Sequence, residues 1–188
     1  MTRERARELY KDDYHELKIE FIHERKEYIA PAAIEHNDTA DYIKEILRHF
    51  IRDNKLPYKL CADSLIVHYD DKHYATPDIA VVSDPSKIIK NSIYYPPELV
   101  IEILSESTRD RDLISKKNAY GKFGVPEYWT VNPNEKTVTV WKNEGARLEI
   151  EKIYSLPSEN YDPEIDEYEY ETKFNTPLFG DALTLDLE

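Results

Sequence analysis

Two short apolar runs in the middle of the chain have the pattern of buried β-strands. Residues 76–83 read Thr-Pro-Asp-Ile-Ala-Val-Val-Ser, and residues 97–105 read Pro-Glu-Leu-Val-Ile-Glu-Ile-Leu-Ser. Apolar, largely β-branched residues bounded by proline, serine or aspartate are typical of strands inside a sheet. Each run nevertheless carries a carboxylate, because Asp78 opens the first and Glu102 lies in the middle of the second.

Glu102 needs a positively charged partner. Residues 99–101 before it and residues 103–104 after it are all apolar, so an ionised group lies in an apolar strand whichever face its neighbours take. Such a group costs several kcal/mol unless a cation meets it. We therefore expect a positive side chain beside Glu102.

The segment that follows, residues 109–123, predicts a helix that can supply this partner. Asp112 lies in its first turn, where negative charge favours the helix dipole. At about 100° per residue, Lys116 lies near the middle of the apolar stripe of this helix, which consists of Leu113, Ala119, Tyr120 and Phe123. Lys116 should therefore face the sheet that carries Asp78 and Glu102.

The rest of the pattern predicts further strands and helices around this centre. Before it we expect an amphipathic helix at 1–16, a β-hairpin at 17–30, a long helix at 31–54 and a strand at 58–69. After it we expect strands at 127–131, 136–142, 147–154 and 177–187, with an acidic, tyrosine-rich insertion at about 157–171. The whole chain, 1–188, is then one α/β (α+β) domain, with a mixed central β-sheet flanked by helices.

The loop expected at residues 83–97 combines lysines with aromatic residues. It contains Lys87, Lys90, Tyr94 and Tyr95. Such a combination could hold a nucleic-acid backbone and stack on bases, or it could cap the sheet.

Composition narrows the class of protein. The chain has 188 residues and a formal net charge of −13, which argues against broad, nonspecific attraction to nucleic acid, although its positive groups could be confined to one local rim. A single cysteine, Cys61, excludes an intrachain disulfide and a cysteine zinc cluster. No apolar run approaches the ~18 residues of a membrane span, and the first residues lack the apolar stretch of a signal peptide. We expect a cytoplasmic protein without a membrane partner.

Two acids on neighbouring strands with an inward lysine resemble the core of PD-(D/E)XK nucleases. The resemblance becomes specific when the motifs are combined: Pro77-Asp78, residues 97–108, Arg111-Asp112-Leu113 with Lys116 and Tyr120, and Gly-Val-Pro-Glu-Tyr-Trp at 124–129. Together they resemble the Uma2 family of restriction-endonuclease-like proteins. Two positions depart from the usual pattern. Leu104 stands where the lysine usually follows the second acid, and Asn132 replaces the usual aspartate before Pro133.

The resemblance implies a metal-dependent endonuclease that hydrolyses phosphodiester bonds in DNA. Asp78 and Glu102 would bind Mg²⁺, for which Mn²⁺ may substitute, and Lys116 would act at the scissile phosphate. Glu20 is a candidate outer carboxylate of the cleft, although an exposed strand residue is the more common interpretation. His36 matches a position where the family often carries histidine and could contact phosphate or water there, although such a residue is more often a cap or a surface group.

Two other hypotheses compete with the enzyme. One is a catalytically inactive nuclease fold that binds nucleic acid or protein. The other is a purely structural ion-pair network of Asp78, Glu102 and Lys116. A homodimer is compatible with the enzyme, because enzymes that cut duplex DNA often pair two sites about a twofold axis.

Overall fold

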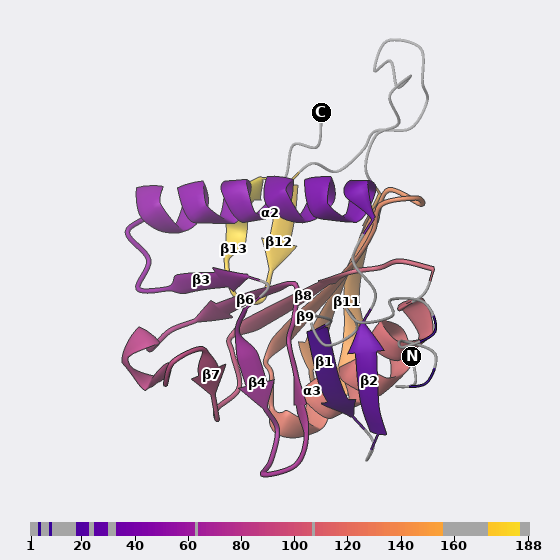
Figure 1. The fold of residues 1–188 in the computed structure, drawn as a ribbon. Helices are drawn as coiled ribbons and strands as arrows, with labels where there is room; N and C mark the ends of the chain where they lie inside the picture. The colour runs from indigo at the N-terminus through magenta and orange to yellow at the C-terminus, as the bar shows by residue number, and fades with distance from the viewer. Residues whose placement is uncertain are drawn as a thin grey trace.

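A six-stranded mixed sheet forms the centre of the computed structural model (Figure 1). The structure describes residues 4, 8, 18–22, 25–29, 33–62, 64–106, 108–155 and 173–184. In the order of the sheet, the strands are β11 (Leu148–Ser155), β10 (Thr137–Asn143), β9 (Glu127–Asn132), β8 (Leu99–Ile103), β6 (Ile79–Val82) and β3 (Lys59–Ala62). Neighbouring strands are antiparallel except β8 and β9, which run parallel. The mixed sheet predicted from the sequence is therefore confirmed.

A second, five-stranded sheet lies beside the central one. Its order is β2 (Arg25–Ile29), β1 (Lys18–Ile22), β5 (Tyr74–Ala75), β4 (Ile66–His68) and β7 (Ser92–Ile93). The pair β1–β2 confirms the predicted hairpin, with Lys18 opposite Ile29. A short two-stranded sheet, β12 (Lys173–Thr176) and β13 (Gly180–Thr184), completes the β-structure of the described residues.

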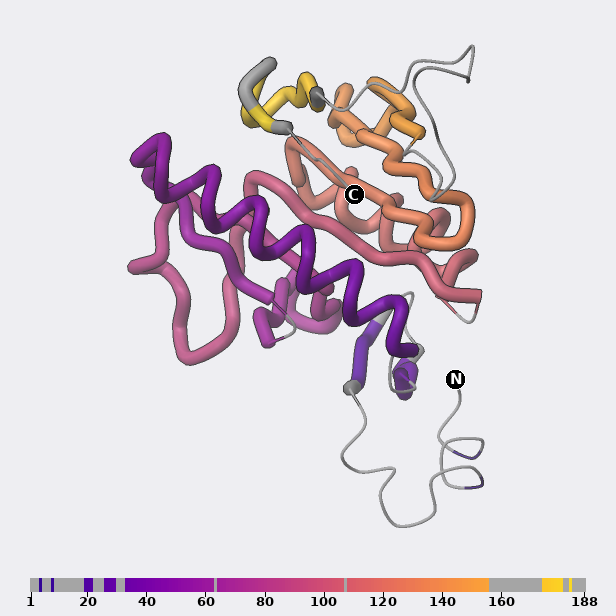
Figure 2. The backbone as a smooth tube through the Cα atoms, turned by 90° about the horizontal axis from the view of Figure 1, so that it is seen from above, coloured from indigo at the N-terminus to yellow at the C-terminus, as the bar shows by residue number. Residues whose placement is uncertain are grey.

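Helices cover both faces of the central sheet. The long helix α2 (Ile34–Asp53) crosses one face, and Figure 2 shows it running along the strands from above. On the opposite face, the segment between β8 and β9 contains a π-helix, η3 (Arg111–Lys116), that continues into α3 (Lys117–Phe123). A short 3₁₀ turn, η2 (Pro85–Lys87), precedes β7. A helical connection is what a parallel strand pair requires, because a tight turn cannot join parallel neighbours.

Side chains of β8 point alternately to the two faces of the central sheet, and these faces differ in polarity. Leu99, Ile101 and Ile103 face the α2 side, where they join a large apolar cluster with Leu47 of the helix and with the β12–β13 hairpin. Val100 points to the other side and packs against residues of α3 and β9. Because side chains alternate along a strand, Glu102 shares the face of Val100.

Three predicted elements differ from the structure. The strand expected at 58–69 is two strands in different sheets, because the chain turns at Ser64, whose N–H donates to the carbonyl of Ala62 at 2.6 Å. The strand expected at 177–187 is the shorter β13, which pairs with β12 in a hairpin and begins at Gly180 with a positive φ of 62°. The loop expected at 83–97 contains η2 and β7.

Two predicted segments fall outside the described residues. These are the acidic insertion at 157–171 and the helix at 1–16, apart from residues 4 and 8. Within the described part of the chain, no helix is both long and apolar enough to cross a membrane.

Candidate active site

The two predicted acids lie on adjacent antiparallel strands. The register of β6 and β8 pairs Ile79 with Ile101 and Ala80 with Val100. One further step along the same register places Asp78 opposite Glu102. Side chains opposite each other across a strand pair project from the same face, so both acids belong to the face covered by α3.

Lys116 reaches this face from the helical segment and meets three carboxylates. Its Nζ lies 2.9 Å from Oε1 of Glu102, 3.1 Å from Oε1 of Glu20 and 3.3 Å from Oδ1 of Asp112. All four side chains are buried. An ammonium group has three protons to donate, so three acids match its donor capacity.

The π-helix accounts for the position of Lys116. Asp112 and Lys116 both lie within η3, and the wider turn leaves both side chains buried against the sheet. Single π-helical turns are rare and are often found at functional sites. The lysine that usually stands at the position of Leu104 is absent here, but Lys116 contacts Glu102 from the helical segment instead.

Glu20 is fully buried, so its interpretation as an exposed strand residue is wrong. It comes from β1 of the second sheet and contacts Lys116. Its Oε1 also accepts a hydrogen bond from the N–H of Thr76 at 3.1 Å, just before β6. Glu20 therefore joins the two sheets beside Lys116, and its role as a carboxylate of the cleft stays a prediction.

Two residues that were not predicted as site residues, Tyr120 and Arg111, also belong to this cluster. The hydroxyl of Tyr120, predicted to pack in an apolar stripe, donates to Oε1 of Glu102 at 3.0 Å. The Nε of Arg111 lies 3.6 Å from both Glu20 and Asp112. Asp112 lies in the first turn of the helical segment, as expected, and is buried there. Its i,i+4 spacing to Lys116 was the available signal for this contact.

Asp78 and His36 form the more accessible end of the site. Oδ2 of Asp78 accepts the N–H of Ile103 at 2.8 Å and lies 3.2 Å from Nε2 of His36. The side chains of His36 and Asp78 are 13% and 12% exposed, whereas that of Lys116 is 2% exposed. The structure thus brings His36, in the first turn of α2, next to the first predicted metal ligand, and among the described residues Asp78 contacts His36 and Ile103 rather than Lys116.

The cluster contains more carboxylates than cations. Among the described residues, the carboxylates of Glu20, Glu27, Glu102 and Asp112 lie within ion-pair distance of two cations, Lys116 and Arg111, and Asp78 lies nearby on the strand next to Glu102. Burial, followed by the charges of Asp78, Asp112 and Glu20, raises the pKa of Glu102 to about 8, although Lys116 opposes this shift.

The lysine responds in the opposite way to the same surroundings. Burial lowers the pKa of Lys116, but the carboxylates of Glu102, Glu20 and Asp112 outweigh burial and hold that pKa well above its usual value. Lys116 is therefore protonated at neutral pH and cannot serve as a general base.

A divalent cation fits this chemistry. Carboxylate oxygens are the ligands that Mg²⁺ prefers, and a nearby positive ion favours the ionised form of a buried acid such as Glu102. Oε2 of Glu102 accepts no hydrogen bond from the described residues, since its partners Lys116 and Tyr120 both bind Oε1. Within the described ranges, no three His, Cys, Asp or Glu side chains form a ready-made metal cage. Mg²⁺ does not need one, because it commonly uses one or two carboxylates together with waters and substrate phosphates.

The lysine- and tyrosine-containing segment 83–97 makes contacts within the protein. Lys87 lies 3.3 Å from Asp84 and 5.3 Å above the ring of Tyr95. Tyr94 stacks on His68 with 4.5 Å between the ring centroids. These contacts support the interpretation of this segment as a cap on the sheet.

Comparisons with known proteins agree with the motifs and the fold. No curated protein matches the chain. A solved structure with a similar fold is that of a "putative nuclease belonging to DUF820 from Anabaena variabilis ATCC 29413". The match covers 96% of this chain and 93% of the other, with a TM-score of 0.69 and 19% identity, and therefore supports the fold alone. The model of the Uma2 family, described as "Putative restriction endonuclease", matches residues 4–165. This chain belongs to the Uma2 family.

Proposed function

We propose that this protein is a metal-dependent endonuclease that hydrolyses phosphodiester bonds in DNA. The observation that carries the proposal is the pair of acids Asp78 and Glu102, opposite each other on adjacent strands beside a buried carboxylate cluster, with both hydrogen-bond donors to Glu102 among the described residues bound at Oε1. The Uma2 family model is described as "Putative restriction endonuclease" and the similar solved structure as a "putative nuclease", and both descriptions support the same reaction class.

Asp78 and Glu102 would hold Mg²⁺, or Mn²⁺ in its place. When bound, this ion would polarise the phosphoryl oxygen and make water a better nucleophile. The backbone N–H of Ile103 and the imidazole of His36 orient Asp78, while Lys116 and Tyr120 orient Glu102 through its Oε1. Oriented ligands of this kind are what a precise metal site requires.

Lys116 contributes a fixed positive charge. Because it stays protonated, its role is to stabilise negative charge that develops on the phosphate and to keep Glu102 in place. Tyr120 also stays protonated, since burial raises its pKa well above the usual value. Neither residue removes a proton from the attacking water at neutral pH.

A structural role for the same cluster is the main alternative. Each of the three acids around Lys116 lies within ion-pair distance, as expected for a network that only links the two sheets to the helix. An inactive module that binds DNA or protein would retain such a network. The alternatives differ in whether a metal ion and DNA cleavage are present.

The test is metal-dependent nicking of supercoiled plasmid and of labelled oligonucleotides. Wild type is compared with Asp78→Asn, Glu102→Gln and Lys116→Met, and with Glu135→Gln as a control that removes an exposed acid. We expect cleavage with Mg²⁺ or Mn²⁺, none with EDTA, and a loss of at least about 100-fold in the three site variants. The control should cleave like wild type.

Two outcomes would overturn the proposal. If pure wild type cuts neither substrate with any divalent ion, the enzyme hypothesis is wrong. If Asp78→Asn and Glu102→Gln cut as well as wild type, the activity belongs to a contaminant or to another site.

A further inference from the structure

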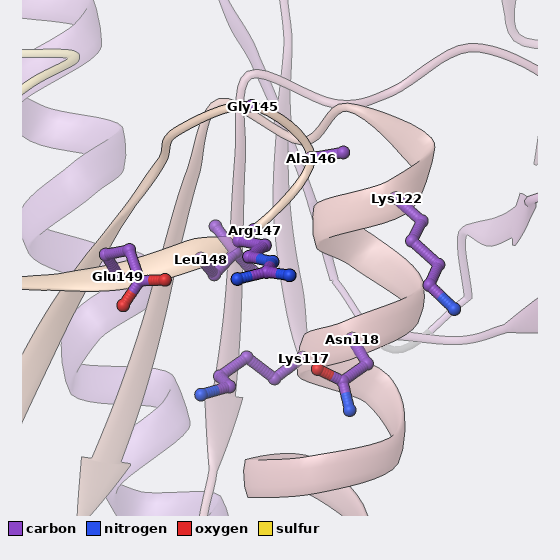
Figure 3. A pocket seen from close by; sticks show the side chains of 8 residues that line it. All are labelled: Lys117, Asn118, Lys122, Gly145, Ala146, Arg147, Leu148 and Glu149. Carbon is purple, nitrogen blue, oxygen red and sulfur yellow. The ribbon is translucent and has the colours of Figure 1, made fainter.

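A basic cavity lies on the outer side of α3, away from the carboxylate cluster. It has a volume of about 350 Å³ and separates α3 from the turn between β10 and β11 (Figure 3). The helix contributes Lys117, Asn118 and Lys122, and the turn contributes Arg147 and Glu149. In Figure 3 the guanidinium of Arg147 extends toward Lys117 and Asn118 across the gap.

The cations of this cavity lack acidic partners. Lys117, Lys122 and Arg147 make no ion pair with any residue in the described ranges. Some exposed cations elsewhere are paired, as Lys87 is with Asp84 and Arg109 with Glu135, and others, such as Lys55 and Lys90, are not paired with any described residue. The distinctive feature of this cavity is that three cations and one acid, Glu149, line it, which gives it a net positive charge in a chain whose formal net charge is −13 and favours anions there.

The backbone around the cavity is fixed by close packing. Gly121 faces the turn so closely that a Cβ there would lie 3.1 Å from the carbonyl oxygen of Ala146. Nδ2 of Asn143 donates to the carbonyls of Gly121 and Val125 at 2.9 Å, and its Oδ1 accepts the N–H of Ala146. The helix and the turn are thus held together, so the cavity is preformed.

One of the cations is itself held in position. The Nζ of Lys117 lies 4.2 Å from the centroid of the Trp141 ring. A cation over an aromatic face is attracted to it and loses conformational freedom. Lys117 is therefore partly preorganised for an anion, which lowers the entropic cost of binding.

A second cavity shares two residues of this helix. Asn118 and Lys122 also line this cavity of about 400 Å³, together with Tyr69 and the ion pair of Asp70 and His73. Two adjoining cavities that share residues fit an extended ligand better than a small ion. A polymer with regularly spaced negative charges has this form.

We propose that Lys117, Lys122 and Arg147 bind phosphate groups of a nucleic-acid backbone outside the reaction centre. This inference rests on the proposed function and names the surface that receives the substrate. Lys117 follows Lys116 directly, and adjacent residues of a helix project about 100° apart. The same helix thus presents one lysine to the acids and the next to this cavity. Contacts of this kind position a strand without reading its sequence.

The test is DNA binding measured by fluorescence anisotropy in EDTA, where cleavage is prevented, over a range of KCl concentrations. Wild type is compared with Lys122→Gln/Arg147→Gln, and with Arg48→Gln/Lys59→Gln, which removes the same charge from exposed positions on α2 and β3. Labelled duplexes of two unrelated sequences, one single strand and inorganic phosphate are the ligands. All variants are checked for wild-type thermal unfolding.

We expect Lys122→Gln/Arg147→Gln to weaken binding about tenfold for both duplexes and to reduce the salt slope by about one to two, while the control double variant changes little. Equal affinity and slope in the two double variants would overturn the inference. Loss of phosphate binding without loss of DNA binding would also overturn it, because the cavity would then serve a small anion.

The two proposals can fail separately. If wild type cuts DNA and the cavity variant binds and cuts like the control, the proposed DNA-binding surface is wrong, while the proposed nuclease activity is supported. If only the cavity variant loses DNA binding and wild type never cuts DNA, the proposed DNA-binding surface is supported and the proposed nuclease activity is wrong. If wild type binds no nucleic acid, both are wrong.

Discussion

The two faces of the central sheet bury different kinds of side chain. Toward α2, the strands bury an apolar cluster that includes Leu47, Ile101 and Trp129. Toward α3, the strands bury Glu102 against Lys116, with Glu20 and further charged groups around them. Apolar burial contributes to stability directly, whereas burying charges costs desolvation that pairing only partly offsets. The buried charges of the α3 face are therefore expected to contribute less net stability than the apolar cluster does.

Each face contains a buried acid with a raised pKa, and the partners differ. On the α2 face, Glu127 accepts hydrogen bonds from the indole of Trp129 and the N–H of Leu178, each at 2.6 Å. Burial raises its pKa to about 7 against these bonds. On the α3 face, Glu102 meets a cation and other acids. Neutral hydrogen-bond donors hold the single buried acid Glu127. The positive charge of Lys116 instead allows several carboxylates to be buried together.

The largest expected effect is the loss of the central cation. Lys116→Met leaves three buried carboxylates without their shared partner and should destabilise the protein by about 3–5 kcal/mol at pH 8. The loss should shrink as the pH falls, because the acids then become neutral. Urea unfolding at several pH values measures both effects, and Lys117→Met is the matched control on the same helix. A variant as stable as wild type at pH 8 would show that the cluster is not ionised.

Truncation on the apolar face should cost somewhat less and should depend little on pH. Leu47 is fully buried under the sheet, and Leu47→Ala should destabilise by about 3 kcal/mol through lost burial and a cavity. The same urea experiment measures it, with exposed Glu45→Ala on the same helix as the control. If the loss of unfolding free energy in Leu47→Ala changes with pH as much as that in Lys116→Met, the proposed difference between the two faces is wrong.

Glu127 predicts a pH dependence of stability that belongs to the α2 face. Its folded pKa of about 7 lies above the ordinary 4.5, so the folded state binds more protons between these values. Its contribution is therefore fully present below about pH 4.5 and is lost as the pH rises to about 7, by about 2–3 kcal/mol. Glu127→Gln cannot ionise and should flatten this part of the curve, whereas exposed Glu144→Gln should not. An unchanged curve in Glu127→Gln would contradict the shift.

The smallest expected effect is at the entrance to the site. His36→Ala removes the group beside Asp78 and should weaken Mn²⁺ binding about tenfold, as is usual when a residue that orients a ligand is lost. His49→Ala, on an exposed part of the same helix, is the matched control. Equal affinities in both variants would mean that His36 does not orient the ligand.

Much of this arrangement followed from local pattern. The apolar runs gave β6 and β8, and the helical period gave α2 and the inward direction of Lys116. The cost of burying the carboxylate of Glu102 without water predicted a cation beside it. Nζ of Lys116 lies 2.9 Å from this carboxylate. These features depend on neighbours in sequence or on the cost of burying one charge.

The parts that sequence reasoning missed depend on tertiary contacts. Glu20 alternates with apolar residues as an exposed strand residue would, and only the approach of the second sheet buries it. Tyr120 fits an apolar stripe, and its hydroxyl finds Glu102 only once α3 is docked. The division of residues 58–69 between two sheets likewise depends on β6 and β7, which pair with its two halves.

Calorimetric titration with Mg²⁺ and Mn²⁺ tests the central claim most directly, namely that the α3 face buries acids in order to hold a divalent ion. Wild type, Asp78→Asn, Glu102→Gln and the control Glu135→Gln are titrated at the same pH. We expect one site in wild type and in the control, and its loss in both Asp78→Asn and Glu102→Gln. Absence of binding in wild type, or equal binding in all four proteins, would contradict the account.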